Sequence, residues 1–189
     1  MRPSKRPHVL GIDDGPFEKR VSESVPLVGV TMEGADLVEA VAVTTFPVDG
    51  EGATDFLADW IGGLRVRPAL QGIFFSGVTL AGLAVVDVEA LAGRLGVPVL
   101  IVNRRNPENH RLAEALRAAG LEHRLAIVER TPAAFSVQRR LFAAQAGSDR
   151  QTATELVCAT RRKSELPEPL RLAHLIARAI VMGESRGRP

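Results

Sequence analysis

Cysteine and aromatic residues are scarce in this sequence. Its 189 residues include one cysteine, one tryptophan and no tyrosine, and aromatic residues make up 4% of the chain. A lone Cys158 excludes an intramolecular disulfide bond and favours a reducing compartment. Its context, TELVCATR, is typical of an apolar helix face and predicts a buried, inert thiol. So few aromatic side chains also argue against a stacking platform for single-stranded bases.

Long apolar runs are absent as well. No stretch approaches the ~18 apolar residues that a membrane-spanning helix needs. The basic start, MRPSKRP, is not followed by the apolar segment of a signal peptide, so we expect a cytoplasmic protein without a membrane partner. With 46% apolar residues the chain can bury a core of its own, and we expect residues 1–189 to form a single domain.

Neither sign of charge dominates overall, but the two halves of the chain differ. Residues 1–94 carry 8 basic and 13 acidic groups, a net charge of −5, whereas residues 95–189 carry 16 and 9, a net charge of +7. One interpretation is that charges simply cluster on solvated faces. The other is a carboxylate-lined site beside a basic rim, which suits a phosphate-bearing partner such as DNA or RNA.

Glycine and proline divide the chain into short elements. The predicted strands are residues 8–13, 25–34, 37–48, 71–77, 97–103 and 123–130. The predicted helices are residues 53–64, 85–96, 108–120, 148–162 and 167–185. The segment 136–147 fits either a strand or a helix. The second and third strands predict an antiparallel hairpin, and the strand–helix–strand unit over 71–103 predicts a parallel pair, so a mixed sheet covered on both faces is expected.

Three helix ends have recognisable signals. Asn106 can cap the helix at 108–120, with Pro107 at its first position and Gly120 just past its end. Ser148 and Gln151 have the spacing of a capping box for the next helix.

Two adjacent carboxylates end the first predicted strand, in HVLGIDDGPF. Side chains alternate along a strand, so Asp13 and Asp14 should point to opposite faces and only one should face a given site. Asp13 is the better candidate for a metal or phosphate site. Asp14 is better placed to cap the Gly15–Pro16 turn, and a turn role for both residues is the plain alternative.

A second group of carboxylates lies in VDGEGATD, with Asp49, Glu51 and Asp55. The segment lies between a strand and a helix, where open α/β sheets place ligands. Mg²⁺ or Mn²⁺ would be held there by one or two carboxylates, waters and a substrate phosphate. The alternative for each residue taken singly is a turn or a helix cap.

Two further features carry polar groups. Ser76, Gly77 and Thr79 form a small polar loop whose backbone amides could hold an anion, and Asp87 could simply begin the following helix. In the last helix, His174 lies on an apolar face with Leu170, and a second apolar face lies opposite, so the helix should be buried on two sides. Such a histidine is more commonly a core residue, but it could face the carboxylates as a general acid or phosphate contact.

Four segments together resemble one family: GIDDGPF, VDG–x–x–AT, GVTLAGLAVVD and SELPEPLRLAHLIARAIVMGESRGR. It is a mostly archaeal family of unknown function, domain-of-unknown-function family ninety-nine, which is related to endonuclease V. The resemblance covers nearly the whole chain and PEPLRLAH is its most specific motif. It implies an α/β, ribonuclease H-like fold, in which a mixed five-stranded sheet carries helices on both faces.

The resemblance also implies roles for single residues. Endonuclease V cuts nucleic acid near deaminated adenine with Mg²⁺ held by acidic residues. Asp13 matches the metal-binding aspartate of the first strand, His174 matches the histidine of the final helix, and the middle acidic residue falls near Asp49 or Glu51. Where the pattern has Asp-Gly after the central strand, this chain has Ser76-Gly77. Losing that carboxylate removes a ligand that two metal ions ~3.5–4 Å apart would need.

The sequence therefore leaves two alternative functions open. The first is a Mg²⁺- or Mn²⁺-dependent nucleic-acid hydrolase with a degraded metal site, in which Asp13, Asp49 and His174 act on a phosphodiester. The second is a non-catalytic relative that kept the fold and binds DNA or RNA. Ser76 favours the second function, whereas Asp13 and His174 favour the first.

Overall fold

One mixed sheet of seven strands forms the centre of the protein. The computed structural model describes residues 6–19, 21–106, 109–162 and 164–185. The strands are β1 (His8–Asp14), β2 (Ser24–Glu33), β3 (Leu37–Pro47), β4 (Gly72–Phe75), β7 (Val99–Asn103), β8 (Phe135–Gln138) and β9 (Leu141–Ala146), in the order β3-β2-β1-β4-β7-β9-β8. Strands β5 (Thr79–Leu80) and β6 (Ala84–Val85) form a separate hairpin.

The pairing explains the mixed character of the sheet. Strands β1, β4 and β7 run parallel, while β2, β3, β8 and β9 pair antiparallel. The predicted mixed α/β sheet and its first hairpin are therefore confirmed. The sheet has seven strands rather than the five expected, because the ambiguous segment 136–147 forms strand β9 and most of β8, and β9 extends the sheet beyond β7.

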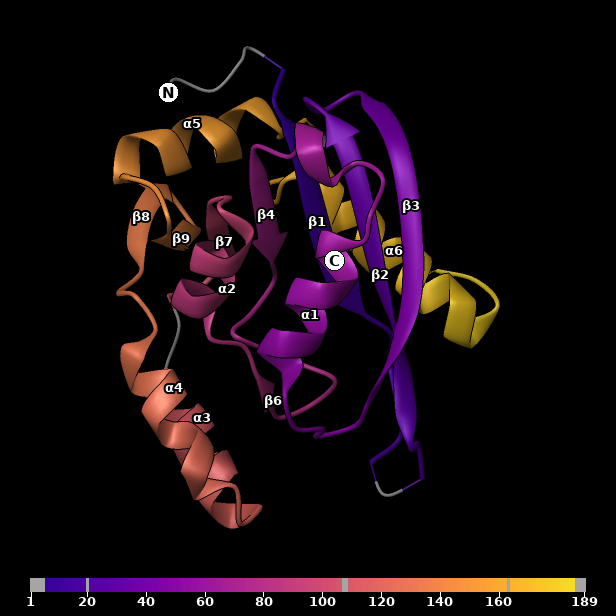
Figure 1. Ribbon diagram of the computed structural model, residues 1–189, viewed down its shortest axis with the longest axis vertical. Coiled ribbons are helices and arrows are strands. Elements are labelled where there is room, and N and C mark those ends of the chain that lie inside the picture. Colours follow the sequence, from indigo (N-terminus) through magenta and orange to yellow (C-terminus); the bar gives the residue numbers. More distant parts are fainter. Residues whose placement is uncertain (1–5, 20, 107–108, 163, 186–189) are drawn as a thin grey trace.

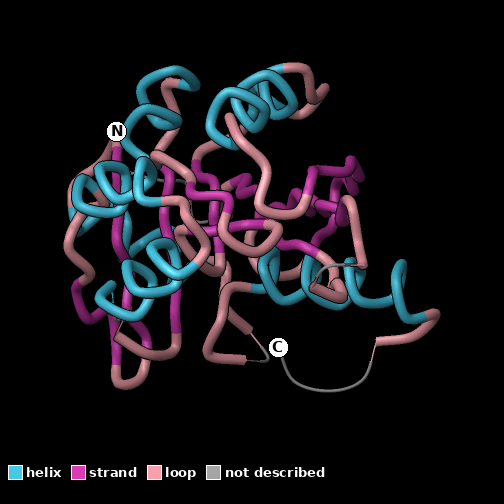
Figure 2. The backbone as a smooth tube through the Cα atoms, turned by 90° about the horizontal axis from the view of Figure 1, so that it is seen from below, coloured by secondary structure: helices cyan, strands magenta, loops and turns pink. Residues whose placement is uncertain are grey.

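Helices cover both faces of the sheet, as predicted (Figures 1 and 2). The helices are α1 (Ala53–Gly62), α2 (Val88–Leu95), α3 (Asn109–Ala118), α4 (Leu125–Arg130), α5 (Arg150–Ala159) and α6 (Glu168–Met182), with short 3₁₀ turns at Arg67–Ala69 and Glu122–Arg124. Helices α1 and α2 share a buried cluster with Leu10 and Ile12 of β1. Helix α5 packs with Val9 on the opposite face, and α6 packs there on β1 and β2.

A glycine in β1 sets how closely α6 can approach the sheet. A Cβ built on Gly11 would lie 2.4 Å from the backbone carbon of Pro169 and 2.5 Å from the backbone nitrogen of Leu170. Both contacts are far inside van der Waals range, and both partners are backbone atoms that cannot rotate away. Gly11 therefore allows the first turn of α6 to lie directly on β1, which brings later residues of α6 beside the end of that strand.

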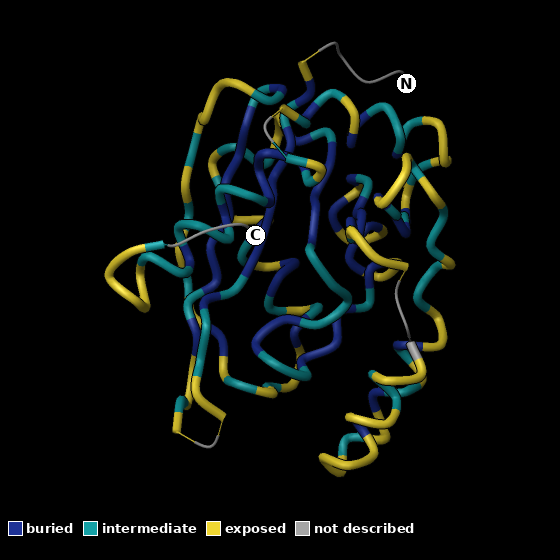
Figure 3. Tube along the Cα trace, turned by 180° about the vertical axis from the view of Figure 1, so that it is seen from behind, coloured by how far each residue is buried: buried dark blue, intermediate teal, exposed yellow. Residues whose placement is uncertain are grey.

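The predicted strand at 123–130 is wrong, because this segment is helical. Leu121, Leu125 and Val128 are spaced four and three residues apart, and they pack with Leu116 of α3 and Val85. This spacing places them on one face of a helix. Helices α3 and α4 form a pair that projects from the rest of the fold and is largely exposed (Figures 1 and 3).

Several local predictions can be checked against the helices. Asp149, not Ser148, caps α5, because its side chain accepts a hydrogen bond from the backbone N–H of Thr152. Cys158 is exposed rather than buried, since the sheet-facing residues of α5 are three others, Ala153, Leu156 and Val157. Asp87 does begin α2 as its N-cap. Pro107, predicted at the first position of the helix that Asn106 would cap, lies outside the described residues.

Helix α6 is buried most deeply in its N-terminal half. Leu170, Ala173 and Ala177 are buried, and Leu172 and Ile176 of the other predicted face are partly buried against β2. Ile180 and Val181 are 49% and 43% exposed, so the expected burial of two faces fails at the C-terminal end of the helix. Within the described ranges, none of the helices has both the length and the apolar character that crossing a membrane requires.

Candidate active site

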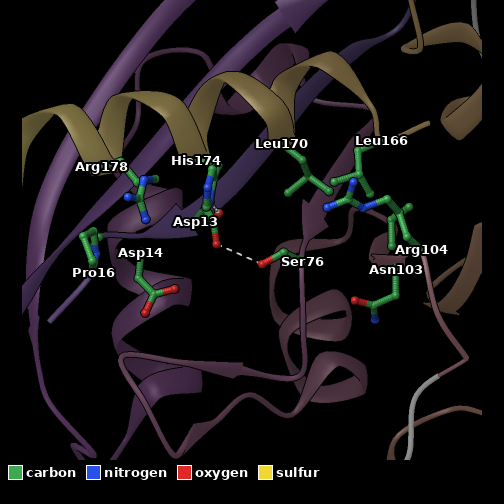
Figure 4. Close-up of a pocket in the computed structure, with 12 residues that line it drawn as sticks. Asp13, Asp14, Pro16, Ser76, Asn103, Arg104, Leu166, Leu170, His174 and Arg178 are labelled. Atoms are coloured by element: carbon green, nitrogen blue, oxygen red, sulfur yellow. Dashed lines mark hydrogen bonds and ion pairs between the residues drawn. The ribbon is translucent and has the colours of Figure 1, made fainter. Parts of the chain in front are cut away.

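The carboxyl ends of the three parallel strands meet at one edge of the sheet. Asp14 ends β1, Ser76 follows β4, and Asn103 ends β7. Because parallel strands end on the same side, their terminal residues lie close together, where open α/β sheets bind ligands. A cavity of about 390 Å³ opens there, which we call the Asp13 cavity (Figure 4). Its polar lining consists of Asp13, Asp14, Ser76, Asn103, Arg104, His174 and Arg178.

Asp13 is held from two sides within this cavity. It is 7% exposed, its Oδ1 accepts a hydrogen bond from Ser76 Oγ at 2.9 Å, and its Oδ2 lies 2.8 Å from His174 Nδ1. An ionised carboxylate only accepts hydrogen bonds, so Nδ1 donates to Asp13 and Nε2 of the imidazole remains able to accept a proton. Residues 13 and 174, near opposite ends of the chain, thus form one carboxylate–imidazole pair.

Asp14 also lines the cavity, from the other face of the sheet. Its Oδ2 accepts from the backbone N–H of Ala81 at 2.9 Å and so does not cap the Gly15–Pro16 turn as expected. The predicted alternation is confirmed, since Asp13 points to α6 and Asp14 to the β5–β6 hairpin. The expectation that only one of them faces the site is wrong, because the cavity extends around the end of β1.

Burial makes Asp14 hard to ionise. Desolvation and, to a smaller extent, the charge of Asp13 raise its pKa from 3.8 to about 6, against the lowering effect of the hydrogen bond from Ala81. Two carboxylates in one cavity repel each other, which disfavours ionising both. Such a pair is stabilised by a positive charge, from a cation or from nearby arginines.

Arg178 supplies one such charge, and the sequence-based reasoning missed it. It follows His174 by one helical turn, so both side chains project from the same side of α6 into the cavity (Figure 4). Among the described residues, its buried Nε has no hydrogen-bond partner. Arg104 lies at the opposite end of the cavity (Figure 4). The i,i+4 spacing from His174 was the signal that could have identified Arg178.

The structure does not bring the second carboxylate group into the cavity. Asp49 accepts a hydrogen bond from the backbone N–H of Leu83 at 2.7 Å, and its own backbone carbonyl accepts from the buried Arg124. Glu51 pairs with Arg124 and His123. Asp55, on α1, pairs with Arg94 of α2. These contacts join the loop before α1 to the β5–β6 hairpin and to the turn before α4, and they join α1 to α2.

The polar loop after β4 contributes one of its three predicted residues. Ser76 lines the cavity, whereas Gly77 and Thr79 do not. Thr79 belongs to β5 and pairs with Val85 of β6. The loop therefore presents a hydroxyl to the site, not a row of backbone amides.

The residues around the cavity suit at most one hard cation. Asp13 and Asp14 offer carboxylate oxygens, and Mg²⁺ is commonly held by one or two carboxylates together with waters and phosphate. Over the described part of the chain, no group of three or more histidine, cysteine or acidic side chains is placed to hold a metal ion. A pair of metal ions needs more carboxylates than this cavity provides, since a serine stands at position 76.

Comparison with known proteins identifies relatives of the whole chain. A family profile described as endonuclease dU matches residues 5–181. A UPF0215 protein of Methanothermobacter thermautotrophicus is 38% identical over 183 residues, covering 95% of this chain and 90% of that protein. One from Thermococcus kodakarensis is 38% identical over 184 residues, covering 94% of each.

Solved structures show the same fold. A protein of unknown function from Archaeoglobus fulgidus superposes with a TM-score of 0.86 and 32% identity, over 94% of this chain and 100% of that one. Endonuclease V from Streptomyces avermitilis gives 0.61 and 18%, over 96% and 84%. Endonuclease V from Ciona intestinalis, in complex with DNA containing an inosine, gives 0.57 and 15%, over 92% and 84%. The similarity to endonuclease V shown by the sequence is confirmed at the level of fold, and this chain belongs to the endonuclease dU family.

Proposed function

We propose that this protein is an endonuclease, which hydrolyses a phosphodiester of nucleic acid in the Asp13 cavity. The observation that carries the proposal is the buried Asp13, held between Ser76 Oγ and His174 Nδ1 at the carboxyl end of β1. Structural neighbours named endonuclease V support it, as does the ribonuclease H-like arrangement that we infer for β3-β2-β1-β4-β7.

Four polar residues of the cavity have a direct place in this reaction. His174 Nε2 can take a proton from the attacking water, and the Asp13 carboxylate orients the imidazole and stabilises its charged form. Arg178 can bind the phosphate, because its buried Nε is without a partner among the described residues. Ser76 fixes the other oxygen of Asp13.

Asp14 is the second carboxylate in this proposal, in place of Asp49. The side chain of Asp49 is engaged by Leu83 outside the cavity, whereas Asp14 lines it. One Mg²⁺ or Mn²⁺ held by Asp13 and Asp14 would neutralise phosphate charge and lower the pKa of a bound water. A bound cation would also offset the repulsion that raises the pKa of Asp14.

The names of the relatives direct the choice of substrate. The family is described as endonuclease dU, and the Ciona endonuclease V was bound to inosine-containing DNA. We therefore test labelled oligodeoxynucleotides that carry one deoxyuridine, one inosine or neither, as single strands and as duplexes, with Mg²⁺, Mn²⁺ or EDTA. Wild-type protein is compared with Asp13→Asn, and Asp149→Asn serves as a matched control, because asparagine caps a helix as well as aspartate does.

Cleavage by wild type and by Asp149→Asn, but not by Asp13→Asn, is the expected result. Tight binding without cleavage under every metal condition would instead favour the alternative, a nucleic-acid-binding relative whose chemistry was lost with the carboxylate at position 76. If the wild type neither binds nor cuts any of the oligonucleotides, the nuclease proposal is wrong.

A further inference from the structure

The two edges of the sheet differ in how well they are protected from pairing with another chain. Strand β8, at one edge, has four residues, is irregular between Ser136 and Gln138, and is followed by Arg139 and Arg140. Strand β3, at the other edge, has 11 residues, and no described strand pairs with its outer side. Short strands, bulges and charged residues all hinder pairing at an edge. Strand β3 is therefore the edge that can accept a further strand.

The central part of β3 carries none of these protective features. Its single charged residue, Glu39, is bulged out of the pairing with β2, and its Oε2 lies 2.7 Å from His8 Nδ1. Its single proline, Pro47, is its last residue. The segment between them, residues 40–46, reads AVAVTTF and contains neither charge nor proline. Uncharged segments of this length that are rich in β-branched and aromatic residues readily pair with another strand.

Exposed apolar side chains are concentrated on β3 and on the last turn of α6 (Figure 3). Among the described residues, eight large apolar side chains are exposed, of which four belong to β3 and three to the last turn of α6. They are Leu37, Val38, Val41 and Val43 on β3, and Ile180, Val181 and Met182 on α6. Monomeric proteins rarely expose large contiguous apolar patches, so such a patch marks a site of interaction.

Three of the β3 residues lie on the face of the sheet that α6 covers. Each of them pairs with a residue of β2 that is buried in the cluster beneath α6. The pairs are Val38 with Met32, Val41 with Val30, and Val43 with Val28. Paired residues point to the same face of a sheet. The exposed side chains of β3 therefore continue the apolar core of β2 into solvent.

The last turn of α6 lies beside the same face of β3. A Cβ built on Gly15 would lie 2.8 Å from Val181 Cγ2 and 2.8 Å from Pro26 Cγ, and Pro26 pairs with Thr45 of β3. The end of the helix and the end of β3 therefore border one exposed apolar surface. We call it the β3 patch, and its residues are Val38, Val41, Val43, Ile180 and Val181.

We propose that the β3 patch binds a second copy of this chain, with the two β3 strands paired antiparallel across a two-fold axis. A two-fold interface needs a surface that complements itself. Residues 40–44, Ala-Val-Ala-Val-Thr, read nearly the same in both directions around Ala42. Pairing about Ala42 places each Val41 opposite a Val43, and the sheet then runs through both copies without a break.

The charges of β3 favour this register. With Ala42 at the axis, each Glu39 comes opposite a Thr45, so no two carboxylates meet. A register centred on Glu39 would instead set the two carboxylates face to face, and like charges directly opposite each other destabilise a strand pair. The partner strand that fits β3 in both charge and pattern is therefore β3 itself. The inference does not rest on the proposed nuclease function.

The test measures self-association of the full chain. Sedimentation equilibrium over a wide range of protein concentration separates the 20.3 kDa monomer from a dimer of twice that mass. Val43→Lys puts a charge inside the interface, at a position that is 53% exposed in the single chain and so tolerates lysine. Val21→Lys, the same change at a loop position that is 72% exposed, is the matched control.

Wild type and Val21→Lys should dimerise, and Val43→Lys should weaken the dimer at least ~10-fold, because an unpaired charge is buried at two symmetric positions. Val41→Glu should weaken it in the same way. An equal mixture of Val41→Glu and Val43→Lys should restore the dimer, because the new carboxylate of one chain faces the new ammonium of the other. This rescue tests the register and also shows that both variants are folded.

Three results would overturn the proposal. A wild type that stays monomeric at every concentration excludes the second copy and leaves β3 open to a strand of another protein. A dimer that Val43→Lys does not weaken uses a different surface. A mixture that fails to restore the dimer contradicts the pairing of the two β3 strands about Ala42. None of these results bears on the nuclease proposal, since the Asp13 cavity is lined by other residues than the β3 patch.

Discussion

The two ends of the parallel strands each carry a cavity, and the larger one is not the candidate active site. At the amino ends of β1, β4 and β7 lies a cavity of about 740 Å³, almost twice the 390 Å³ of the Asp13 cavity. Its ionisable side chains hold the fold together. His8 Nδ1 lies 2.7 Å from Glu39 Oε2, and Asp149 Oδ1 accepts from the backbone N–H of Thr152, also at 2.7 Å, to cap α5.

The two cavities differ most clearly in the pKa of one aspartate from each, Asp149 and Asp14. The backbone hydrogen bond from Thr152 holds the pKa of Asp149 below its usual value, so the fold favours that charge. Burial and the nearby Asp13 raise the pKa of Asp14 to about 6, so the fold opposes that charge. A group held against its own ionisation costs stability, and such groups gather at functional sites. The electrostatic cost, rather than the volume, distinguishes the two cavities.

The largest expected effect on the cleavage rate comes from replacing one of two histidines, and the other serves as the control. His174 and His8 each place Nδ1 against a carboxylate at similar distance, but only His174 lines the Asp13 cavity. His174→Gln should lower the cleavage rate by about 10²–10⁴-fold, the range for a lost general base. His8→Gln should leave it unchanged. Single-turnover cleavage with saturating protein measures both, and equal rates for His174→Gln and wild type would remove His174 from the reaction.

The next largest effect concerns the glycine that lets α6 approach β1. Gly11→Ala forces its Cβ against the backbone of Pro169 and Leu170. Such overpacking typically costs about 1–3 kcal/mol, so the unfolding free energy in urea should fall by about 3 kcal/mol. Cleavage should weaken too, because α6 carries His174.

Gly93→Ala is the matched control for this substitution. An added Cβ meets nothing within 4 Å at that exposed position of α2, so the variant should be as stable as wild type or more so. Equal stability of Gly11→Ala and wild type would show that α6 can move away from β1 without loss.

Much of the framework could be predicted from local pattern, and the failures have physical causes. Alternation and continuous apolar runs identified β1, β2, β3, β4 and β7 and the opposite facing of Asp13 and Asp14. The prediction for 123–130 failed because a short apolar run was assigned to a strand, although Leu121, Leu125 and Val128 have helical spacing and pack with Leu116 of the preceding helix and Val85 of β6. A short apolar run fits a strand and a buried helix equally well, and here the packing against α3 decides for the helix.

The site was less predictable than the fold. The residues alone offered a meeting of Asp13 with His174 only as an alternative to a core histidine, and the family resemblance then favoured it, since no spacing rule joins residues 161 positions apart. Asp49 was placed by its position after a strand, but a neighbouring backbone N–H engages its side chain. Asp14 was assigned to the turn from strand alternation and the Gly-Pro signal, neither of which reveals a cavity that extends around a strand end.

Asp14→Asn should stabilise the protein at high pH and leave it unchanged at low pH. The folded state binds the proton more tightly than the unfolded state, so wild-type stability falls as pH rises from 3.8 through about 6. The full penalty above that window is about 2–3 kcal/mol. Asparagine keeps an oxygen for the N–H of Ala81 and cannot ionise. Urea unfolding at pH 8 should show a gain of about 2 kcal/mol that vanishes near pH 4, and a gain equal at both pH values would contradict the electrostatic cause.

The smallest effect is expected on replacing Asp149, which should destabilise the protein where Asp14→Asn stabilises it. Its pKa is lowered in the folded protein, so its stabilisation is present above the unfolded value of 3.8 and is lost as the pH falls below it. Asp149→Ala removes the cap of α5 and should lower the melting temperature at pH 7 by a few degrees, with cleavage unchanged. Thermal unfolding of both aspartate variants at pH 7 then gives shifts of opposite sign. Shifts of the same sign would contradict the inference that the fold favours the charge of Asp149 and opposes the charge of Asp14.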